Sequence, residues 1–180
     1  MGFFLLSGGG PVALPAHEAP VPQAPGYAVT LTAYNAVPEQ TDGDPLTTAS
    51  GAYSNPAVVA ARSQDLADEM PFGTVIEVDG SNAAEKNCGF DVVEPIIGYR
   101  VIADAMNARY TKRIDILFTT KKDYRTTDKG MRNAAEILGI CDGITIRVVG
   151  RINISDMPKT QAELARMIRG GGGALALNTK

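Results

Sequence analysis

Hydrophobic and polar residues alternate along several short segments of the chain, which is the pattern of half-buried β-strands. The first such segment, YAVTLTAY, covers residues 27–34. Val29, Leu31 and Ala33 are its apolar positions. They alternate with the polar positions Thr30, Thr32 and Tyr34. The segment is therefore expected to turn one apolar face toward a core and a threonine-rich face to the other side of a sheet.

Six further segments are expected to be strands, because each is short, largely apolar and bordered by turn-forming residues. They are residues 48–53, 58–61, 74–78, 98–104, 113–118 and 144–152. About seven short strands, combined with only short helices, predict a small barrel rather than a layered α/β sheet. The expected fold class is therefore mainly β.

Helical character is confined to short segments. Residues 62–70 favour a short helix, and residues 127–139 favour a helix that Thr127 would cap and Gly139 would end. Residues 79–95, DGSNAAEKNCGFDVVEP, are expected to form an inserted loop because they are rich in turn-forming and polar residues.

The two ends of the chain differ in composition from this central region. Residues 1–26 are rich in Pro and Gly and are expected to be a tail or a processed export segment. The apolar run Phe3–Leu6 is too short to span a membrane and lacks the preceding positive charge of a signal peptide. Residues 27–152 would form the barrel, and residues 153–180 a helix with a Gly-rich tail. The apolar stripe around Leu164 favours packing of that helix on the barrel over docking of a partner.

The composition excludes several kinds of site. The single histidine, His17, lies in the N-terminal tail, so neither a Ser-His-Asp triad nor a multi-histidine metal site is expected in the barrel. A net charge of −3 does not favour a nucleic-acid partner, and the absence of Trp excludes a Trp platform for sugars. Cys88 and Cys141 would form one disulfide in an exported protein or remain two free thiols.

Two aspartates occupy expected strands, where this residue type is depleted. Asp104 lies at the end of VIAD, and Asp115 lies in RIDILF between Ile114 and Ile116. The two isoleucines would point to the face opposite Asp115. A carboxylate at such a position requires either a hydrogen-bond partner or a functional role, and the pattern leaves both interpretations open.

Four blocks of the chain together resemble the 3D domain, a family named for three aspartates. The blocks are AYNAVPEQTD…TASG, PFGTVIEV, VIADAMNARY and RIDILF, and their order and spacing match over residues 29–149. This family is similar to the catalytic barrel of MltA-type lytic transglycosylases and to stationary-phase survival proteins of the YuiC type. The chain departs from many members after Asp104, where AMNARY replaces a Gly-rich turn.

The resemblance implies a six-stranded double-psi β-barrel with short peripheral helices. It also implies an enzyme, exported to the cell envelope or beyond, that cleaves the MurNAc–GlcNAc bond of peptidoglycan to a 1,6-anhydro product. In such an enzyme the sugar's own C6 hydroxyl attacks, so one carboxyl serves as general acid and then as general base. Glycan strands of peptidoglycan would be the partner, and no metal or other cofactor would be needed.

Carried over to this chain, the resemblance places Asp115 at the position of the general acid and base, with Asp104 and Asp42 as the other two aspartates. Four other polar side chains are candidates for binding the sugar: Tyr34, Thr48, Ser50 and Asn107. The alternative function is a non-catalytic polysaccharide-binding barrel, similar to expansin modules. The presence of both strand aspartates favours the enzyme, because binding alone does not require an acid.

Overall fold

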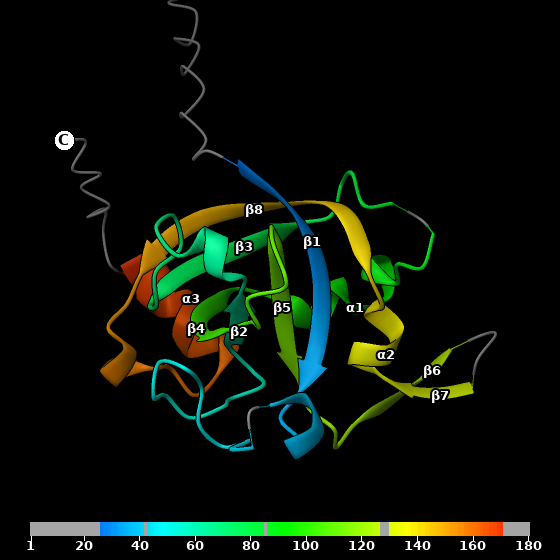
Figure 1. Cartoon of the computed structure of the whole chain (residues 1–180), viewed down its shortest axis with the longest axis horizontal. Helices are drawn as coiled ribbons and strands as arrows, with labels where there is room; N and C mark the ends of the chain where they lie inside the picture. The colour runs from blue at the N-terminus through cyan, green and yellow to red at the C-terminus, as the bar shows by residue number, and fades with distance from the viewer. Residues whose placement is uncertain (1–25, 42, 85, 127–129, 171–180) are drawn as a thin grey trace, which may run out of the picture.

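The structure is a computed structural model that describes residues 26–41, 43–84, 86–126 and 130–170. Its centre is a closed barrel of strands in the order β1-β5-β2-β4-β3-β8, with β8 pairing to both β3 and β1 and so closing the barrel (Figure 1). The mainly β class and the barrel are therefore confirmed. The barrel strands are β1 Gly26–Asn35, β2 Val59–Arg62, β3 Thr74–Asp79, β4 Arg100–Ala105, β5 Arg113–Phe118 and β8 Cys141–Arg151.

Two of the six strand pairs are parallel, namely β1 with β5 and β2 with β4. The other pairs are antiparallel. A parallel partner cannot be reached through a tight turn, so each parallel pair joins segments that are distant in the sequence. This arrangement sets β5, β2 and β4 side by side, and these are the strands on or beside which the predicted aspartates lie.

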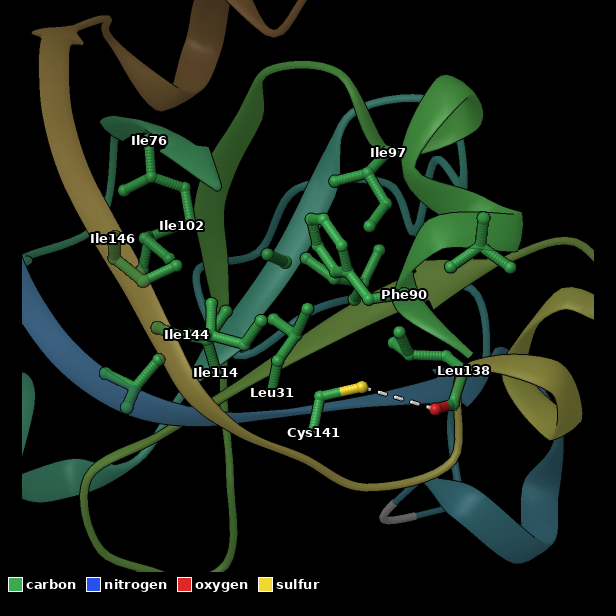
Figure 2. Packing of buried hydrophobic residues seen from close by; sticks show 14 of the residues in the cluster. Leu31, Ile76, Phe90, Ile97, Ile102, Ile114, Leu138, Cys141, Ile144 and Ile146 are labelled. Atoms are coloured by element: carbon green, nitrogen blue, oxygen red, sulfur yellow. Dashed lines mark hydrogen bonds between the residues drawn. The ribbon is translucent and has the colours of Figure 1, made fainter. Parts of the chain in front are cut away.

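The interior of the barrel is filled by alternate side chains of its strands. Leu31, Ile102, Ile114, Ile144 and Ile146 are completely buried there, and Figure 2 shows them converging from β1, β4, β5 and β8. Burial of each such side chain stabilises the fold by about 1.5–3 kcal/mol. The alternation read from the sequence at residues 27–34 is confirmed, with its apolar positions facing this core.

A second apolar cluster lies on the outer face of the barrel. It includes Tyr34, Ala61, Val101 and Leu117 from the strands and Leu164 from helix α3, Gln161–Gly170. Leu164 is fully buried, so the helix expected near the C-terminus packs on the barrel as predicted.

The side chain of Gln161 fastens this helix to the barrel. Its Nε2 donates to the carbonyl oxygens of Ala57 and Tyr99, and its Oε1 accepts from the Tyr99 amide. These contacts join α3 to the residues that precede β2 and β4. The outer face of the barrel is thus covered on this side.

Arg100, at the start of β4, is buried, and its side chain forms hydrogen bonds to backbone carbonyl oxygens. Its guanidinium donates to the carbonyls of Ile96, Ile97, Pro56 and Leu117. Burial lowers the pKa of Arg100 to about 9. The side chain satisfies the last carbonyls of a helix and also ties that helix to β5.

That helix, α1 Phe90–Ile97, corrects the expectation of a loop over residues 79–95. Phe90, Val93 and Ile97 are spaced to share one face, and all three are buried. Pro95 lies inside the helix, where it ordinarily signals an end, and Gly98 terminates the helix at a positive φ of 57°. The apolar residues at helical spacing therefore determine the conformation of this segment, in spite of the turn-forming residues around them.

Other predicted elements are shorter than expected or absent. Residues 48–53 form no strand; Thr47 and Tyr53 make an isolated bridge around a turn. The helix expected over residues 62–70 is reduced to a 3-10 turn, η2 Gln64–Leu66. Two other 3-10 turns are η1 Pro38–Gln40 and η3 Ile154–Asp156.

The helix expected over residues 127–139 begins later, as α2 Ala134–Leu138. Its N-cap is Asn133, whose side chain accepts from the amides of Ala135 and Glu136, whereas Thr127 lies outside the described residues. Residues before it form a hairpin that projects from the barrel in Figure 1, β6 Asp123–Thr126 with β7 Gly130–Asn133. The predicted end at Gly139 is confirmed.

Cys88 and Cys141 form a disulfide that links the segment before α1 to the first residue of β8. This settles the alternative left open by the sequence. The sulfur of Cys141 also lies 3.4 Å from the carbonyl oxygen of Leu138, the contact marked in Figure 2. A disulfide sulfur carries no proton, so that contact is one of packing. The bridge fixes α1 and α2 to the same edge of the barrel.

Candidate active site

Asp104 and Asp115 lie level with each other on the outer face of the barrel. Both are paired with Ala61 of β2, Asp104 from β4 on one side and Asp115 from β5 on the other. Residues paired across neighbouring strands project from the same face of a sheet. The structure therefore brings together two of the three predicted aspartates.

A register shift between Ala60 and Ala61 produces this arrangement. Before the shift β2 pairs Ala60 with Ile102, and after it Ala61 pairs with Asp104, so Ala103 is skipped. Strict alternation along β4 would have sent Asp104 to the interior face with Ile102. The irregularity instead turns Asp104 outward, which is a common use of β-bulges next to functional sites.

Asp115 is a partly buried carboxyl with one side-chain donor. The Thr32 hydroxyl on β1 donates to its Oδ1 at 2.8 Å. Burial raises the pKa of Asp115 to about 6, against the lowering effects of the Thr32 hydrogen bond and of the Arg113 charge. The negative charge of Asp104 raises the pKa further and is the smallest of these contributions. Asp115 is therefore able to hold a proton close to neutral pH.

Asp104 is surrounded by donors. Its Oδ2 accepts from the Tyr34 hydroxyl at 2.8 Å, and its Oδ1 accepts from the amides of Ala49 and Ala105 at 2.9 Å each. These three hydrogen bonds hold the Asp104 carboxyl group in one orientation. The two aspartates thus occupy different environments although they are close neighbours.

Tyr34 is buried and acts as a neutral donor. Burial, followed by the charge of Asp104, raises the pKa of Tyr34 well above its usual range. The phenol therefore retains its proton and donates a hydrogen bond to Asp104. Together Tyr34 and Thr32 place one hydroxyl donor of β1 on each aspartate.

The loop of residues 47–53 contacts the site through its backbone. The Ala49 amide donates to Asp104, and the Ser50 amide donates to the Ala103 carbonyl at 3.1 Å. Thr48 is buried, and its hydroxyl donates to the Ala52 carbonyl and lies 3.0 Å from the Ser50 hydroxyl. Of the predicted sugar-binding residues, Thr48 therefore holds the loop in shape, and Ser50 is the more accessible of the two.

The remaining predicted residues differ in position. Asn107 is exposed in the turn after β4, where its side chain accepts from the Arg109 amide and its carbonyl accepts from the Tyr110 amide. Its observed contacts are those of a turn residue. Asp42 lies outside the described residues.

Three contributors to the site were not singled out from the sequence. Thr32 was expected only to lie on a polar strand face, and the Ala49 amide has no signal in a side-chain pattern. Arg113 shares the outer face of β5 with Asp115, two residues away, and its charge acts on that carboxyl. The sequence RID at residues 113–115 indicates that Arg113 lies near Asp115, because alternate residues of a strand share a face.

A cavity of about 450 Å³ lies apart from the aspartates, between α1, β3 and α3. Its lining includes Phe90, Glu94, Tyr99 and Gln161 and contains no predicted site residue. In the part of the chain that the structure describes, no three His, Cys, Asp or Glu side chains gather as they would around a metal ion. None of the helices within the described ranges has the length and apolar content required to cross a membrane.

Comparison of the chain with protein-family models, with curated proteins and with solved structures gives no match. The resemblance to the 3D domain therefore rests on the sequence blocks themselves.

Proposed function

We propose that this protein is a peptidoglycan lytic transglycosylase in which Asp115 is the general acid and base. The observation that carries the proposal is the pairing of Asp104 and Asp115 with Ala61 on one outer face, with burial holding the pKa of Asp115 at about 6. A carboxyl in such surroundings suits proton transfer near neutral pH. The four sequence blocks that resemble the 3D domain support the same reaction class.

In the proposed reaction Asp115 begins protonated. It gives its proton to the oxygen that leaves with GlcNAc, as the bond from that oxygen to C1 of MurNAc breaks. The C6 hydroxyl of the same MurNAc attacks C1 and forms the 1,6-anhydro ring. The Asp115 carboxylate then takes the proton of that hydroxyl, so the acid is regenerated and no water is consumed.

The neighbours of Asp115 have positioning roles in this proposal. Thr32 orients the Asp115 carboxyl through its hydrogen bond, and Tyr34 and the Ala49 amide hold Asp104 in place. The charge of Asp104 opposes ionisation of Asp115. The accessible hydroxyl of Ser50 is available for the sugar at the edge of the site.

We further propose that the barrel has double-psi topology. The two parallel pairs, β1 with β5 and β2 with β4, are joined by the antiparallel pair of β5 with β2, and this juxtaposition supports the proposal.

The disulfide supports the proposal that the protein works outside the reducing cytoplasm. Cys88 and Cys141 are bonded to each other, and such bonds persist mainly in oxidising compartments. Peptidoglycan is located there, so the proposed substrate and the proposed location agree.

The test is product analysis with purified peptidoglycan sacculi. The wild-type protein is expected to release soluble muropeptides whose mass is that of the 1,6-anhydro form, 18 Da (about one water) below the hydrolysed form. Asp115→Asn is expected to lower the release by roughly 10²–10⁴-fold, since Asn keeps the shape but cannot give and recover a proton. A cooperative melting curve with a midpoint at or above that of the wild type would show that the variant is folded.

Two outcomes would replace the proposal. Products with the mass of the hydrolysed form would assign a hydrolase. Firm binding to sacculi with no released product, equally in the wild type and Asp115→Asn, would assign the polysaccharide-binding barrel.

A further inference from the structure

The turn between β4 and β5 places two arginines on one tyrosine beside the candidate active site. The guanidinium carbons of Arg109 and Arg113 each lie 4.8 Å from the centroid of the Tyr110 ring. Arg109 also donates to the Tyr110 hydroxyl at 2.9 Å. The turn is held by Asn107, through its side chain and its carbonyl. Arg109 is exposed, whereas Arg113 and Tyr110 are partly buried.

Neither guanidinium forms a salt bridge within the described ranges, although the charge of Arg113 acts on Asp115. The salt bridges there join Arg132 to Glu136 and Arg147 to Asp79. Two cations that share one ring repel each other, and stacking on the ring offsets only part of that cost. The turn thus holds two guanidinium charges that no salt bridge neutralises among the described residues.

Arg113 also has an unused donor. Its Nε is buried and has no hydrogen-bond partner among the residues that the structure describes. A buried donor without a partner carries a desolvation cost. Because Nε is buried, a ligand would be held by the terminal nitrogens of the guanidinium, which are not among the buried unpartnered atoms of the described residues. Arg113 lies two residues from Asp115 on the same strand face, and its charge acts on that carboxyl. The charge of Arg113 is thus next to the proposed acid.

We propose that Arg109, Tyr110 and Arg113 form an anion-binding subsite that holds a carboxylate of the stem peptide attached to the glycan strand. This inference rests on the proposed function. Guanidinium groups match carboxylates in charge and in the spacing of their donors, whereas neutral sugar hydroxyls do not require them. In peptidoglycan the peptide is attached to MurNAc, the sugar whose bond is broken, so its carboxylates lie near the reacting bond. The protein would therefore select strands that still carry peptides.

The test compares two substrates, purified glycan strands with their peptides and the same strands after an amidase has removed them. The wild type is expected to cleave the peptide-bearing strands with a KM about tenfold lower. Arg109→Gln is expected to reduce this preference about fivefold, through KM and not kcat, and Arg109→Lys to restore part of it. The preference is expected to weaken as ionic strength rises, because Arg109 is exposed.

Arg166→Gln is the matched control, because it removes an exposed arginine from α3 with the same change in charge. It is expected to keep the wild-type preference. An equal loss in Arg166→Gln would assign the effect to overall charge and overturn the subsite. A wild type that treats both substrates alike would also overturn it. A third arm uses peptide-free strands that carry the phosphate polymers of the wall; a preference for these would reject the carboxylate.

A binding measurement distinguishes failure of the proposed enzyme function from failure of the proposed subsite. If no strand is cleaved, sedimentation of the protein with the same two substrates still measures the preference. A preference that Arg109→Gln abolishes would keep the subsite without the enzyme. Equal binding of both substrates would remove the subsite as well.

Discussion

Asp104 and Asp115 stand level with each other on the two strands that flank β2. Three donors surround Asp104, whereas Asp115 has one side-chain donor, and burial raises the pKa of Asp115 to about 6. Two like groups are thus fitted for different tasks by their surroundings. The assignment of Asp115 as the acid follows from this asymmetry.

Asp104→Asn is expected to reduce activity less than Asp115→Asn, because Asp104 only positions and tunes the acid in the proposed reaction. Loss of its charge also lowers the pKa of Asp115, since that charge raises it. The loss of activity on the alkaline side should move to lower pH, by less than one unit because this contribution is small. The check is the pH profile of anhydro-muropeptide release. A larger loss in Asp104→Asn than in Asp115→Asn would exchange the two roles.

Asp115→Asn is expected to stabilise the fold at pH 8. The pKa of Asp115 is about 6 in the folded chain against an ordinary value of 3.8, so the folded state binds more protons between these values. Stability is therefore lost as pH rises from about 4 to 6, by at most about 3 kcal/mol. The Asp115→Asn variant does not have this loss. Its free energy of unfolding should exceed that of the wild type by about 1–3 kcal/mol at pH 8 and by little at pH 4. Denaturant unfolding at both pH values measures the difference; an equal effect at both would contradict the raised pKa.

Tyr34→Phe is expected to destabilise the fold by about 1–3 kcal/mol, because it removes a buried donor from a charged group. The same change should lower activity by loosening Asp104. The matched control is Tyr53→Phe, since Tyr53 is 66 % exposed and should show an unchanged melting temperature. Equal melting temperatures for Tyr34→Phe and the wild type would mean that the hydrogen bond to Asp104 contributes nothing to stability.

Replacing both Cys88 and Cys141 by Ala is expected to cost about 2–5 kcal/mol of stability, because their disulfide closes a loop across a sequence separation of 53 residues. A reducing agent should lower the melting temperature of the wild type toward that of the double variant. The double variant itself should not respond to the reducing agent. Thermal unfolding with and without dithiothreitol provides the measurement, and a response in the double variant would point to a different effect of the reagent.

The barrel strands were predicted because their signal is local. Alternation along β1 and the apolar runs of β4 and β5 follow from burial of one face, and the structure keeps these elements within a few residues. Leu164 likewise identified the buried side of α3. Such features depend on the spacing of neighbouring residues, which a sequence displays directly.

The parts that were missed depend on partners distant in sequence. The register shift that turns Asp104 outward arises between β2 and β4 and has no counterpart in the alternation of either strand. The donation from Ala49 belongs to a backbone amide, which every residue except proline has. In α1, burial of the face containing Phe90 and Ile97 stabilises the helix more than Pro95 destabilises it. That balance depends on packing against the core, which the sequence does not display.

The position of β8 in the barrel has a consequence for biosynthesis. β1 is the first strand to be made, and its neighbours β5 and β8 follow some eighty and more residues later. Until residues 113–118 have emerged, neither edge of β1 has its partner, and one edge remains unpaired until residues 141–151 have followed. Unpaired edges invite association with other chains. The barrel therefore cannot be closed by adding strands in their order along the chain, and the edge of β1 that pairs with β8 stays open until β8 has been made.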